Sequence, residues 1–385
     1  MQFTDEHCAF RDSLKRFVRN ELPPGFARKC DAEQMAPLEQ YRRLAAAGFL
    51  GTTVPESYGG SGGGCVELAI MLEELARGMV SFSVMVFRSA IHGSHSLLAY
   101  GSEEQRRTLI PKIVSGEMLL SLSLTEPQAG SDAANIKIRA VMDGDCFVIN
   151  GQKMYSSAAH IVDLVLLVAR TATTGKPHEG ISLIFVDPRS PGVTINRIPT
   201  LGERAVGTNM VFYDNVRVPV TNLVGRLHGG WAQLMSNLEK ERLSAACFAL
   251  GGCESILEQS VAYAKQRVQF GSPIGSFQVI QHKLADMAIE IQLARSLIYD
   301  LAEKIDRGER CRMEASIAKA FCAEMYNRIA YQGMQIHGGL GYTMETDMQL
   351  HLRDARLMTI GGGSSEIMRN IIAKELGLPQ GNRQG

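Results

Sequence analysis

Apolar residues change their spacing twice along this chain, and this change constrains the fold more than any other feature of the sequence. Before about residue 117 they recur at helical spacing, as in Leu68, Met71 and Leu75. The middle of the chain has short β-type runs, and helical spacing returns from about residue 228. The order helical, β, helical predicts an α+β protein with three domains, at residues 1–117, 118–227 and 228–385.

The middle segment shows no helix-length period and therefore predicts a β domain. DGDCFVINGQKMYSS (143–157) has the Asn150-Gly151 pair between two short apolar runs, which predicts a hairpin that turns there. Because no long helices separate the runs that follow, an antiparallel barrel or sandwich is favoured over a parallel sheet. The further strands are expected at 164–170, 181–187, 193–199 and 209–219, and long bundle helices at 230–265, 278–307 and 312–335.

The composition narrows the class of protein. Lys+Arg and Asp+Glu balance at 40 each, so no basic surplus indicates nucleic-acid binding. No apolar run reaches membrane-spanning length, and the acidic, amphipathic N-terminus is unlike a signal or transit peptide. The 8 cysteines form no CxxC pair, and the 9 histidines show no metal-ligand spacing. We therefore expect a cytoplasmic protein with reduced thiols, no metal site and no membrane span.

Several common catalytic motifs are absent from the sequence. No GxGxxG follows a predicted strand, and there is no Walker loop, GxSxG elbow or HExxH pair. These absences argue against a Rossmann dinucleotide site, a P-loop nucleotide site, a serine-hydrolase elbow and a zinc-protease helix.

One charged residue interrupts an apolar stripe near the start of the C-terminal segment. Leu234, Leu238, Glu241 and Ala245 follow the spacing of one helix face. A carboxylate on such a stripe lies in the core or lines a cavity, where burial makes it a stronger base. Spacing alone leaves two interpretations open, a catalytic base or a structural ion pair with Arg242.

Three further segments are candidates for ligand binding. GGGSSEIMRN (361–370) is a glycine loop that enters a helix with Ser364 or Ser365 as N-cap, and its N–H groups suit an anion or a polarised carbonyl. The alternative is a plain capping loop. SLTEPQAGSD (123–132) is a polar, turn-rich loop. QIHGGLGY (335–342) ends a helix with glycines, and a lone histidine there, His337, is more often structural than catalytic.

Together these segments resemble the acyl-CoA dehydrogenase family, and the resemblance covers essentially the whole chain. It implies an N-terminal helical domain, a middle antiparallel β domain and a C-terminal four-helix bundle. It also implies FAD, an acyl-CoA substrate, electron-transfer flavoprotein as acceptor and a homotetramer. The motifs that carry it are VPESYGG (54–60), YGSEEQRRTLIPKIVSGE (100–117), SLTEPQAGSD, INGQKMYSS (149–157), VRVPVTNLVG (216–225), QRVQFGSPIGSFQVIQHKLADMAIE (266–290), QIHGGLGY and RDARLMTIGGGSSEIMRNIIAKEL (353–376).

The resemblance assigns cofactor-binding roles residue by residue. Leu124 and Thr125 occupy flavin-contacting positions. Tyr155 stands where most members have a tryptophan over the flavin, and Ser157 where a threonine hydroxyl usually bonds flavin N5. The positions that match holders of the rest of FAD, in part across a subunit boundary, are Arg267, Phe270, Gln278, Gln335, Gly339, Ser364 and Glu366.

The position of the catalytic base departs from many members of the family. They carry a glutamate in the loop after the RDA motif, where this chain has Gly362. A smaller set carries the base in a Glu-Arg pair on the first long C-terminal helix, which Glu241-Arg242 matches. With the apolar stripe, this favours Glu241 as the base that removes the α-proton while the β-hydride goes to flavin N5. The N–H of Gly362 would polarise the thioester carbonyl.

The substrate is less constrained by the sequence. Ser131 lies where the thioester end is approached in relatives, and Arg242 orients the substrate or the base. Arg88, His92 and His95 match the helix that lines the acyl pocket and favour a short, functionalised or carboxylated chain, unless they point elsewhere. Acyl length and branching stay open, and the substrate belongs to fatty or branched acyl metabolism.

Three other activities compete with dehydrogenation. The same scaffold can run as an enoyl-CoA reductase, and the residues do not fix the direction. An acyl-CoA oxidase is disfavoured, because oxidases usually carry an extra C-terminal domain. A non-catalytic flavin- or CoA-thioester-binding protein is suggested by Gly362 and opposed by Glu241.

Overall fold

The computed structural model of the protein describes residues 3–173 and 175–379. The chain divides into two compact units that do not follow chain order. Unit 1 comprises residues 1–33, 64–84 and 239–385, and unit 2 comprises residues 34–63 and 85–238. The first helices therefore pack with the C-terminal ones, although most of the chain separates them in sequence.

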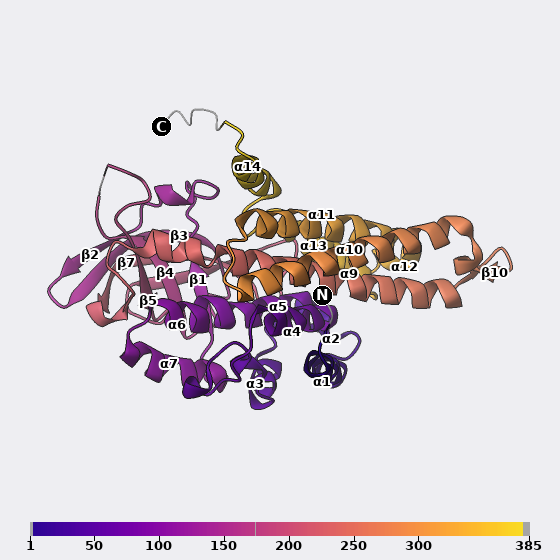
Figure 1. The fold of residues 1–385 in the computed structure, drawn as a ribbon, viewed down its shortest axis with the longest axis horizontal. Helices are drawn as coiled ribbons and strands as arrows, with labels where there is room; N and C mark the ends of the chain where they lie inside the picture. Colours follow the sequence, from indigo (N-terminus) through magenta and orange to yellow (C-terminus); the bar gives the residue numbers. More distant parts are fainter. Residues whose placement is uncertain (1–2, 174, 380–385) are drawn as a thin grey trace. The chain divides into compact units, whose positions relative to one another are not determined.

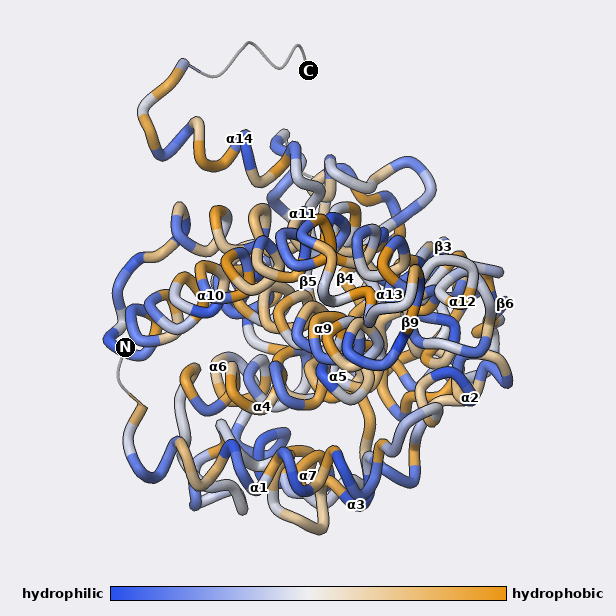
Figure 2. Tube along the Cα trace, turned by 90° about the vertical axis from the view of Figure 1, so that its right-hand side faces the viewer, coloured by the Kyte–Doolittle hydropathy of each residue, from blue (hydrophilic) through white to orange (hydrophobic). Residues whose placement is uncertain are grey.

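Unit 1 is helical, and its long helices are antiparallel neighbours in Figure 1. Its three longest helices have 29, 29 and 26 residues, so each extends for roughly 40 Å. Figure 2 shows hydrophobic and hydrophilic residues interleaved along α10, as expected of a helix with one face in the core. Its elements are α1 (Asp5–Glu21), α2 (Phe26–Glu33), α4 (Cys65–Gly78), α9 (Leu238–Gln266, in this unit from Glu239), β9 (Val268–Gln269), β10 (Ser272–Pro273), η6 (Ile274–Ser276), α10 (Gln278–Asp306), α11 (Arg312–His337), α12 (Gly339–Tyr342), α13 (Met348–Met358) and α14 (Ser365–Glu375).

A buried ionic network ties α1 to α4 and α10. Arg11 donates to Glu74 at 2.6 Å, to Glu73 at 3.0 Å and to the Tyr299 hydroxyl at 2.6 Å. Both glutamates are fully buried, so water does not solvate their carboxylates, and the Arg11 guanidinium provides the opposite charge. The N-terminus of α4 is held by a distant carboxylate, because Asp306 accepts the N–H groups of Cys65 and Val66 at 2.7 and 3.1 Å.

Unit 2 combines short helices with one sheet. Its core lies where α6, α7 and the loop around Val54 cover the sheet face that carries Leu166, Leu183 and Phe185. The helical elements are α3 (Leu38–Ala46), η1 (Phe49–Gly51), η2 (Glu56–Tyr58), the π-helix η3 (Arg88–His95), α6 (Ser96–Tyr100), α7 (Glu103–Val114), η4 (Ala133–Asn135), η5 (Val220–Asn222) and α8 (Gly230–Ser236), while α5 (Val80–Phe87) runs from one unit into the other.

The sheet has the strand order β6-β7-β3-β2-β4-β5-β8, with β1 paired to β4. Its pairs are antiparallel except β1 with β4, and a single parallel bridge between β2 and β4. Most pairs are therefore antiparallel, as predicted, whereas β1, a strand that the sequence did not predict, pairs with β4 in parallel. Its strands are β1 (Leu120–Ser123), β2 (Arg139–Asp143), β3 (Cys146–Ser157), β4 (Leu164–Arg170), β5 (Ile181–Val186), β6 (Val193–Ile198), β7 (Thr208–Pro219) and β8 (Leu223–Val224).

The predicted hairpin turn at Asn150-Gly151 is wrong. Strand β3 runs through both residues without a turn, and the chain reverses at Gly144, between β2 and β3. The strand absorbs Gly151 as an irregularity in its pairing with β7. The Asn150 side chain bridges to β7 instead, because its amide group donates to Asn215 at 3.1 Å and accepts the Asn215 N–H at 2.9 Å.

The helix expected at 230–265 is broken at Asn237, which separates α8 from α9. Leu234 therefore lies on α8, while Leu238, Glu241 and Ala245 lie on α9, so the apolar stripe is not continuous on one helix. The other long helices and the four later strands lie within two residues of their expected bounds.

All eight cysteines are free thiols. Among the described residues, no helix is long and apolar enough to cross a membrane. Over the same residues, no three His, Cys, Asp or Glu side chains gather as a metal site.

Candidate active site

The loop that carries Leu124 and Thr125 follows β1 in unit 2 and folds into a tight turn. Glu126 and Ala129 exchange both backbone hydrogen bonds at 3.1 Å, so Pro127 and Gln128 form the tip. Leu124 and Thr125 stay half-buried just before the turn, whereas Ser131 is exposed after it. The turn thus leaves the two predicted flavin-contacting residues on a fixed backbone.

A bulge in β3 presents Tyr155. The pairing of β3 with β7 shifts between Lys153 and Ser156, and Tyr155 has a positive φ of 58°, which bulky residues rarely adopt. Tyr155 is 58% exposed. Ser156 points inward and bonds the Ser123 hydroxyl, while Ser157 is half-buried. The strand therefore places the Tyr155 side chain outside, while the buried Ser156 beside it anchors the bulge.

Sequence reasoning missed an ion pair behind this loop. The Lys153 ammonium donates to Glu126 at 2.9 Å and to the Leu124 carbonyl at 2.6 Å, and both side chains are buried. Burial lowers the pKa of Lys153 to about 8, although Glu126 opposes the shift. The signal in the sequence was a lysine at an inward-facing strand position three residues after Asn150.

The residues predicted to line the acyl pocket lie on a π-helix. Arg88 and His95 are half-buried, and His92 is buried with its ring edge-on to Phe87 at 4.9 Å between ring centroids. A π-helix is rare and often marks a functional site, because it costs regular hydrogen bonding. Strand β1 packs directly against this helix, so the π-helix and the loop after β1 belong to one packed region of unit 2.

In unit 1, Glu241 and Arg242 lie in the first turns of α9. Glu241 is half-buried and Arg242 is buried. Burial lowers the pKa of Arg242, and the neighbouring Arg312 adds to this shift, while Glu241 opposes it. The Glu241 carboxylate therefore lies close to a buried cation.

The glycine loop 361–363 is attached to the same charged region through Lys319 on α11. The buried Lys319 ammonium donates to the Gly363 carbonyl. Burial lowers the pKa of Lys319 to about 8, and nearby Arg242 contributes. Gly362 has a positive φ of 64°, and a Cβ there would meet no atom within 4 Å, so its backbone faces open space.

The residue after the glycine loop caps α14. Ser364 accepts the Ile367 N–H at 3.3 Å, as predicted for one of the two serines. Glu366 is exposed in the first turn of α14. Both border a hollow of about 290 Å³, which Arg356, Thr359 and Ile360 also line.

The other predicted cofactor residues gather at the opposite end of α9. Stacking of Tyr263 on His337, with ring centroids 4.5 Å apart, brings the end of α11 to the end of α9. His337 is buried and its Nδ1 bonds the Gly333 carbonyl at 2.8 Å, which is a structural role. The exposed residues at this end are Arg267, Phe270, Gln278, Gln335 and Gly339.

A short hairpin of β9 and β10 carries Phe270 at its tip, and this residue is 96% exposed. Arg267 precedes the hairpin, and Glu241 lies 26 positions earlier on α9, or roughly 39 Å along the helix axis. The predicted base Glu241 and the predicted cofactor residue Arg267 therefore lie near opposite ends of α9.

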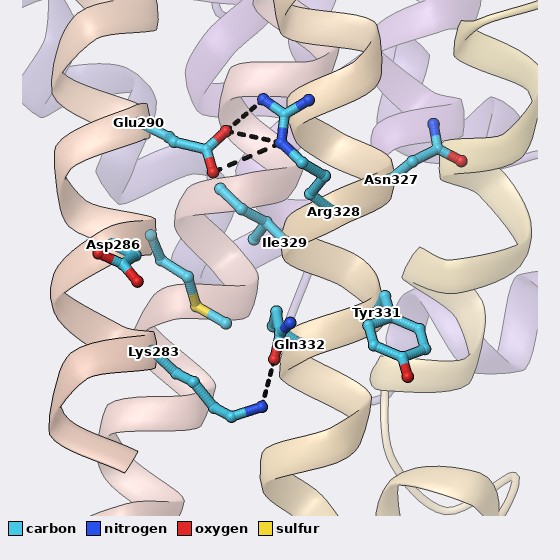
Figure 3. A pocket seen from close by; sticks show the side chains of 9 residues that line it. Lys283, Asp286, Glu290, Asn327, Arg328, Ile329, Tyr331 and Gln332 are labelled. Atoms are coloured by element: carbon cyan, nitrogen blue, oxygen red, sulfur yellow. Dashed lines mark hydrogen bonds and ion pairs between the residues drawn. The ribbon is translucent and has the colours of Figure 1, made fainter. Parts of the chain in front are cut away.

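A further hollow of about 450 Å³ lies along α10 and α11, and its lining residues come from these two helices (Figure 3). Glu290 pairs there with Arg328, and Lys283 donates to Gln332 at 2.5 Å. None of the predicted site residues lines it.

Comparison with known proteins identifies the family. Three family models match the chain: acyl-CoA dehydrogenase N-terminal domain at residues 4–117, middle domain at 121–216 and C-terminal domain at 228–377. The chain belongs to the acyl-CoA dehydrogenase family, and it is an enzyme of the oxidoreductase class. Membership in this family implies FAD as the cofactor.

Individual relatives match over almost the whole chain. It is 39% identical to the probable acyl-CoA dehydrogenase YngJ of Bacillus subtilis (strain 168), over 97% of this chain and 99% of that protein. It is 33% identical to the caffeyl-CoA reductase-Etf complex subunit CarC of Acetobacterium woodii, over 97% and 98%. A solved structure of the glutaryl-coenzyme A dehydrogenase glutaryl-CoA complex superimposes with a TM-score of 0.94 at 32% identity, over 100% of this chain and 98% of that one. The predicted family and fold class are confirmed.

Proposed function

We propose that the protein dehydrogenates an acyl-CoA thioester between its α and β carbons to give the 2-enoyl-CoA, with Glu241 as the base. The observation that carries this proposal is the half-buried Glu241 carboxylate beside the buried Arg242, in a chain that has Gly362 in place of the glutamate common in relatives. A base must stay unprotonated at neutral pH and be shielded from bulk water. Glu241 is followed directly by the buried Arg242, the residue proposed to orient the base or the substrate.

The proposed roles of the other residues follow from their backbone settings. Leu124 and Thr125 would hold the flavin edge, Tyr155 would face its ring, and Ser157 would offer its hydroxyl to N5. When bound, FAD supplies the hydride acceptor. Gly362 donates its N–H to the thioester carbonyl, which makes the α C–H more acidic, and a preorganised donor of this kind contributes about 3 kcal/mol. Ser131 and Arg242 position the substrate, and Ser364 and Glu366 hold the cofactor at the loop before α14.

A substitution of the base tests the proposal. Glu241→Gln should keep FAD and still bind acyl-CoA, but lose turnover by roughly 10³-fold, because the α-proton has no acceptor. Glu239→Gln, on the same turn of α9, is the matched control and should keep activity within about twofold. Stopped-flow reduction of the flavin separates binding from chemistry. Rapid flavin reduction in Glu241→Gln would remove the assignment of the base.

For the acyl chain we propose a short, functionalised or carboxylated group. Arg88, His92 and His95 place two half-buried and one buried basic side chain on the π-helix. Their chemistry suits a carboxylate or a polar substituent better than a long alkyl chain. The similarity to a structure with glutaryl-CoA bound supports this choice. A straight long-chain acyl-CoA as the best substrate would contradict it.

A second candidate is enoyl-CoA reduction on the same residues. It is favoured by the relative named as a caffeyl-CoA reductase subunit. The two directions differ in the flavin potential, which can be measured by xanthine oxidase titration with reference dyes. A potential well below that of the enoyl-CoA/acyl-CoA couple favours reduction, and one close to it favours dehydrogenation.

For assembly we propose a homotetramer whose cofactor site is completed by a second copy. The roughly 39 Å along α9 supports this, because the proposed base Glu241 and the proposed FAD contact Arg267 lie near opposite ends of one helix. The almost fully exposed Phe270 would then be covered by the second copy.

Electron-transfer flavoprotein is the proposed electron acceptor, in line with the Etf complex named for one relative. We also propose three domains with bounds 1–117, 118–227 and 228–385, and a cytoplasmic location, which the free thiols support.

A further inference from the structure

Lys153 is a lysine with no access to water inside unit 2. Its ammonium has two described acceptors, the Glu126 carboxylate at 2.9 Å and the Leu124 carbonyl at 2.6 Å. A buried ammonium costs several kcal/mol in lost hydration, so it is retained only where its contacts are specific. Here one of the two contacts is the backbone of the loop assigned to the flavin.

Glu126 is bonded from several sides. Its carboxylate accepts the N–H groups of Lys137 at 2.6 Å and Ile138 at 3.1 Å, and the Gln128 amide at 2.6 Å. Burial alone would raise the pKa of Glu126, but Lys153 and the two backbone N–H groups lower it. The carboxylate is therefore charged and tied to both ends of the segment 126–138.

Further hydrogen bonds connect this segment to the bulge of β3. The N–H of Met154 donates to the Thr125 carbonyl at 2.8 Å, next to the Lys153 contact with Leu124. Ser156 is fixed by the Ser123 hydroxyl and by Asn209, whose amide donates to the Ser156 carbonyl at 2.9 Å. The carbonyls of Leu124 and Thr125 are thus held by Lys153 and Met154 of β3, directly before Tyr155 turns outward.

We propose that the Lys153–Glu126 pair is a positioning device that locks the loop 124–126 to the bulge 153–157, and thereby sets the affinity for FAD and the environment of its flavin ring. This inference rests on the proposed function, since it takes Leu124, Thr125, Tyr155 and Ser157 as flavin contacts. Neither Lys153 nor Glu126 reaches the surface, so both act through the backbone that they hold and touch no substrate.

A purely stabilising role is the competing explanation, and the two differ in what a neutral replacement does. A buried ion pair exchanged for uncharged side chains of similar size is often neutral or stabilising, because the cost of burying both charges disappears. If the pair only stabilises, the double variant Lys153→Met with Glu126→Gln should bind FAD normally. If the pair positions the loop, the variant keeps its fold but loses the contact with Leu124.

The experiment compares apoprotein stability with FAD binding in this double variant. We expect a thermal midpoint of the apoprotein close to that of the wild type, and FAD bound roughly tenfold to a hundredfold more weakly in fluorescence titration. The visible absorption bands of bound flavin should also shift, which a change in stability alone would not produce. Arg139→Met, which removes an exposed cation from the adjacent strand β2, is the control and should leave both readouts unchanged.

Three results would count against the inference. Wild-type affinity and an unshifted flavin spectrum in the double variant would overturn it while leaving the proposed function intact. Loss of the folded apoprotein in that variant would make the pair a stability element and overturn it as well. A wild-type protein that takes up no FAD would instead refute the proposed function, and the inference with it.

Discussion

The Lys319→Met variant offers a worked test of how the glycine loop is held. Lys319 is almost completely buried on α11, and its ammonium bonds the Gly363 carbonyl. Methionine has a similar length and no charge, so the substitution removes one contact and one buried cation together. The two effects have opposite signs, and their sizes decide the outcome.

The relief from removing the charge follows from the pKa. Burial and Arg242 lower the pKa of Lys319 from 10.5 to about 8, which corresponds to a penalty of roughly 3 kcal/mol on the charged form at neutral pH. The lost hydrogen bond to Gly363 costs about 1.5–3 kcal/mol, and water can replace it at this half-buried loop. The net change in the free energy of unfolding at pH 7 should therefore stay within about 1.5 kcal/mol.

The stability difference between wild type and variant should change with pH in a defined direction. Below about pH 8 both folded and unfolded wild type keep the proton, so the penalty is fully present. Between about pH 8 and 10.5 the folded state releases the proton while the unfolded chain keeps it, so wild-type stability rises with pH. The variant lacks this rise, and urea unfolding at pH 7 and pH 10 should show the difference shifting in favour of the wild type by up to roughly 3 kcal/mol.

Turnover supplies the second readout. On the proposed function, freeing the loop misplaces the Gly362 N–H, and kcat should fall by roughly tenfold. Strong destabilisation of Lys319→Met at pH 7, or a stability difference that does not change between pH 7 and 10, would refute the reasoning.

Two further predictions concern the charged network and the cap of unit 1. Arg11→Met should destabilise by about 3 kcal/mol in urea unfolding, because it removes the one cation that bonds both buried carboxylates, and a loss below about 1 kcal/mol would contradict this. Among the described residues, Glu73 then keeps only Arg295 at 3.3 Å, and Glu74 keeps only Arg77 at 3.6 Å, as cations within ion-pair distance. Asp306→Ala should cost about 1–2 kcal/mol, measured the same way, since two N–H groups at the start of α4 lose their acceptor, and no change in stability would show that water replaces the carboxylate.

The order of helical and β segments along the chain was predictable, because it follows from the spacing of apolar residues in the sequence. The spacing of apolar residues predicts these elements with few alternatives, as at the helices 278–306 and 312–337 and the strand 164–170. The turn at Asn150-Gly151 failed because cross-strand bonds to Asn215 extend the strand through a pair that locally favours a turn. Local propensity is weak against a partner strand.

Other features depend on contacts distant in sequence and left little local signal. Asn237 interrupts the predicted helix where its buried amide donates to Ser96 at 3.1 Å, and nothing nearby in sequence marks that partner. The π-helix at 88–95 contains Gly93, two serines and two histidines, which are weak helix formers but do not by themselves predict a π-helix. The site residues were assigned by resemblance to a family. The Lys153–Glu126 ion pair could not be predicted in this way, because it forms only where the loop after β1 packs against β3.

The most direct test of the central claim is an anaerobic spectral titration of the purified protein with straight, branched and carboxylated acyl-CoAs. The proposed function predicts that the protein carries FAD and that one acyl-CoA, of the short functionalised or carboxylated kind, bleaches the flavin stoichiometrically. A protein that carries FAD which no acyl-CoA in the panel reduces would contradict dehydrogenation and leave reduction of an enoyl-CoA as the activity to measure. A protein without FAD would contradict the account as a whole.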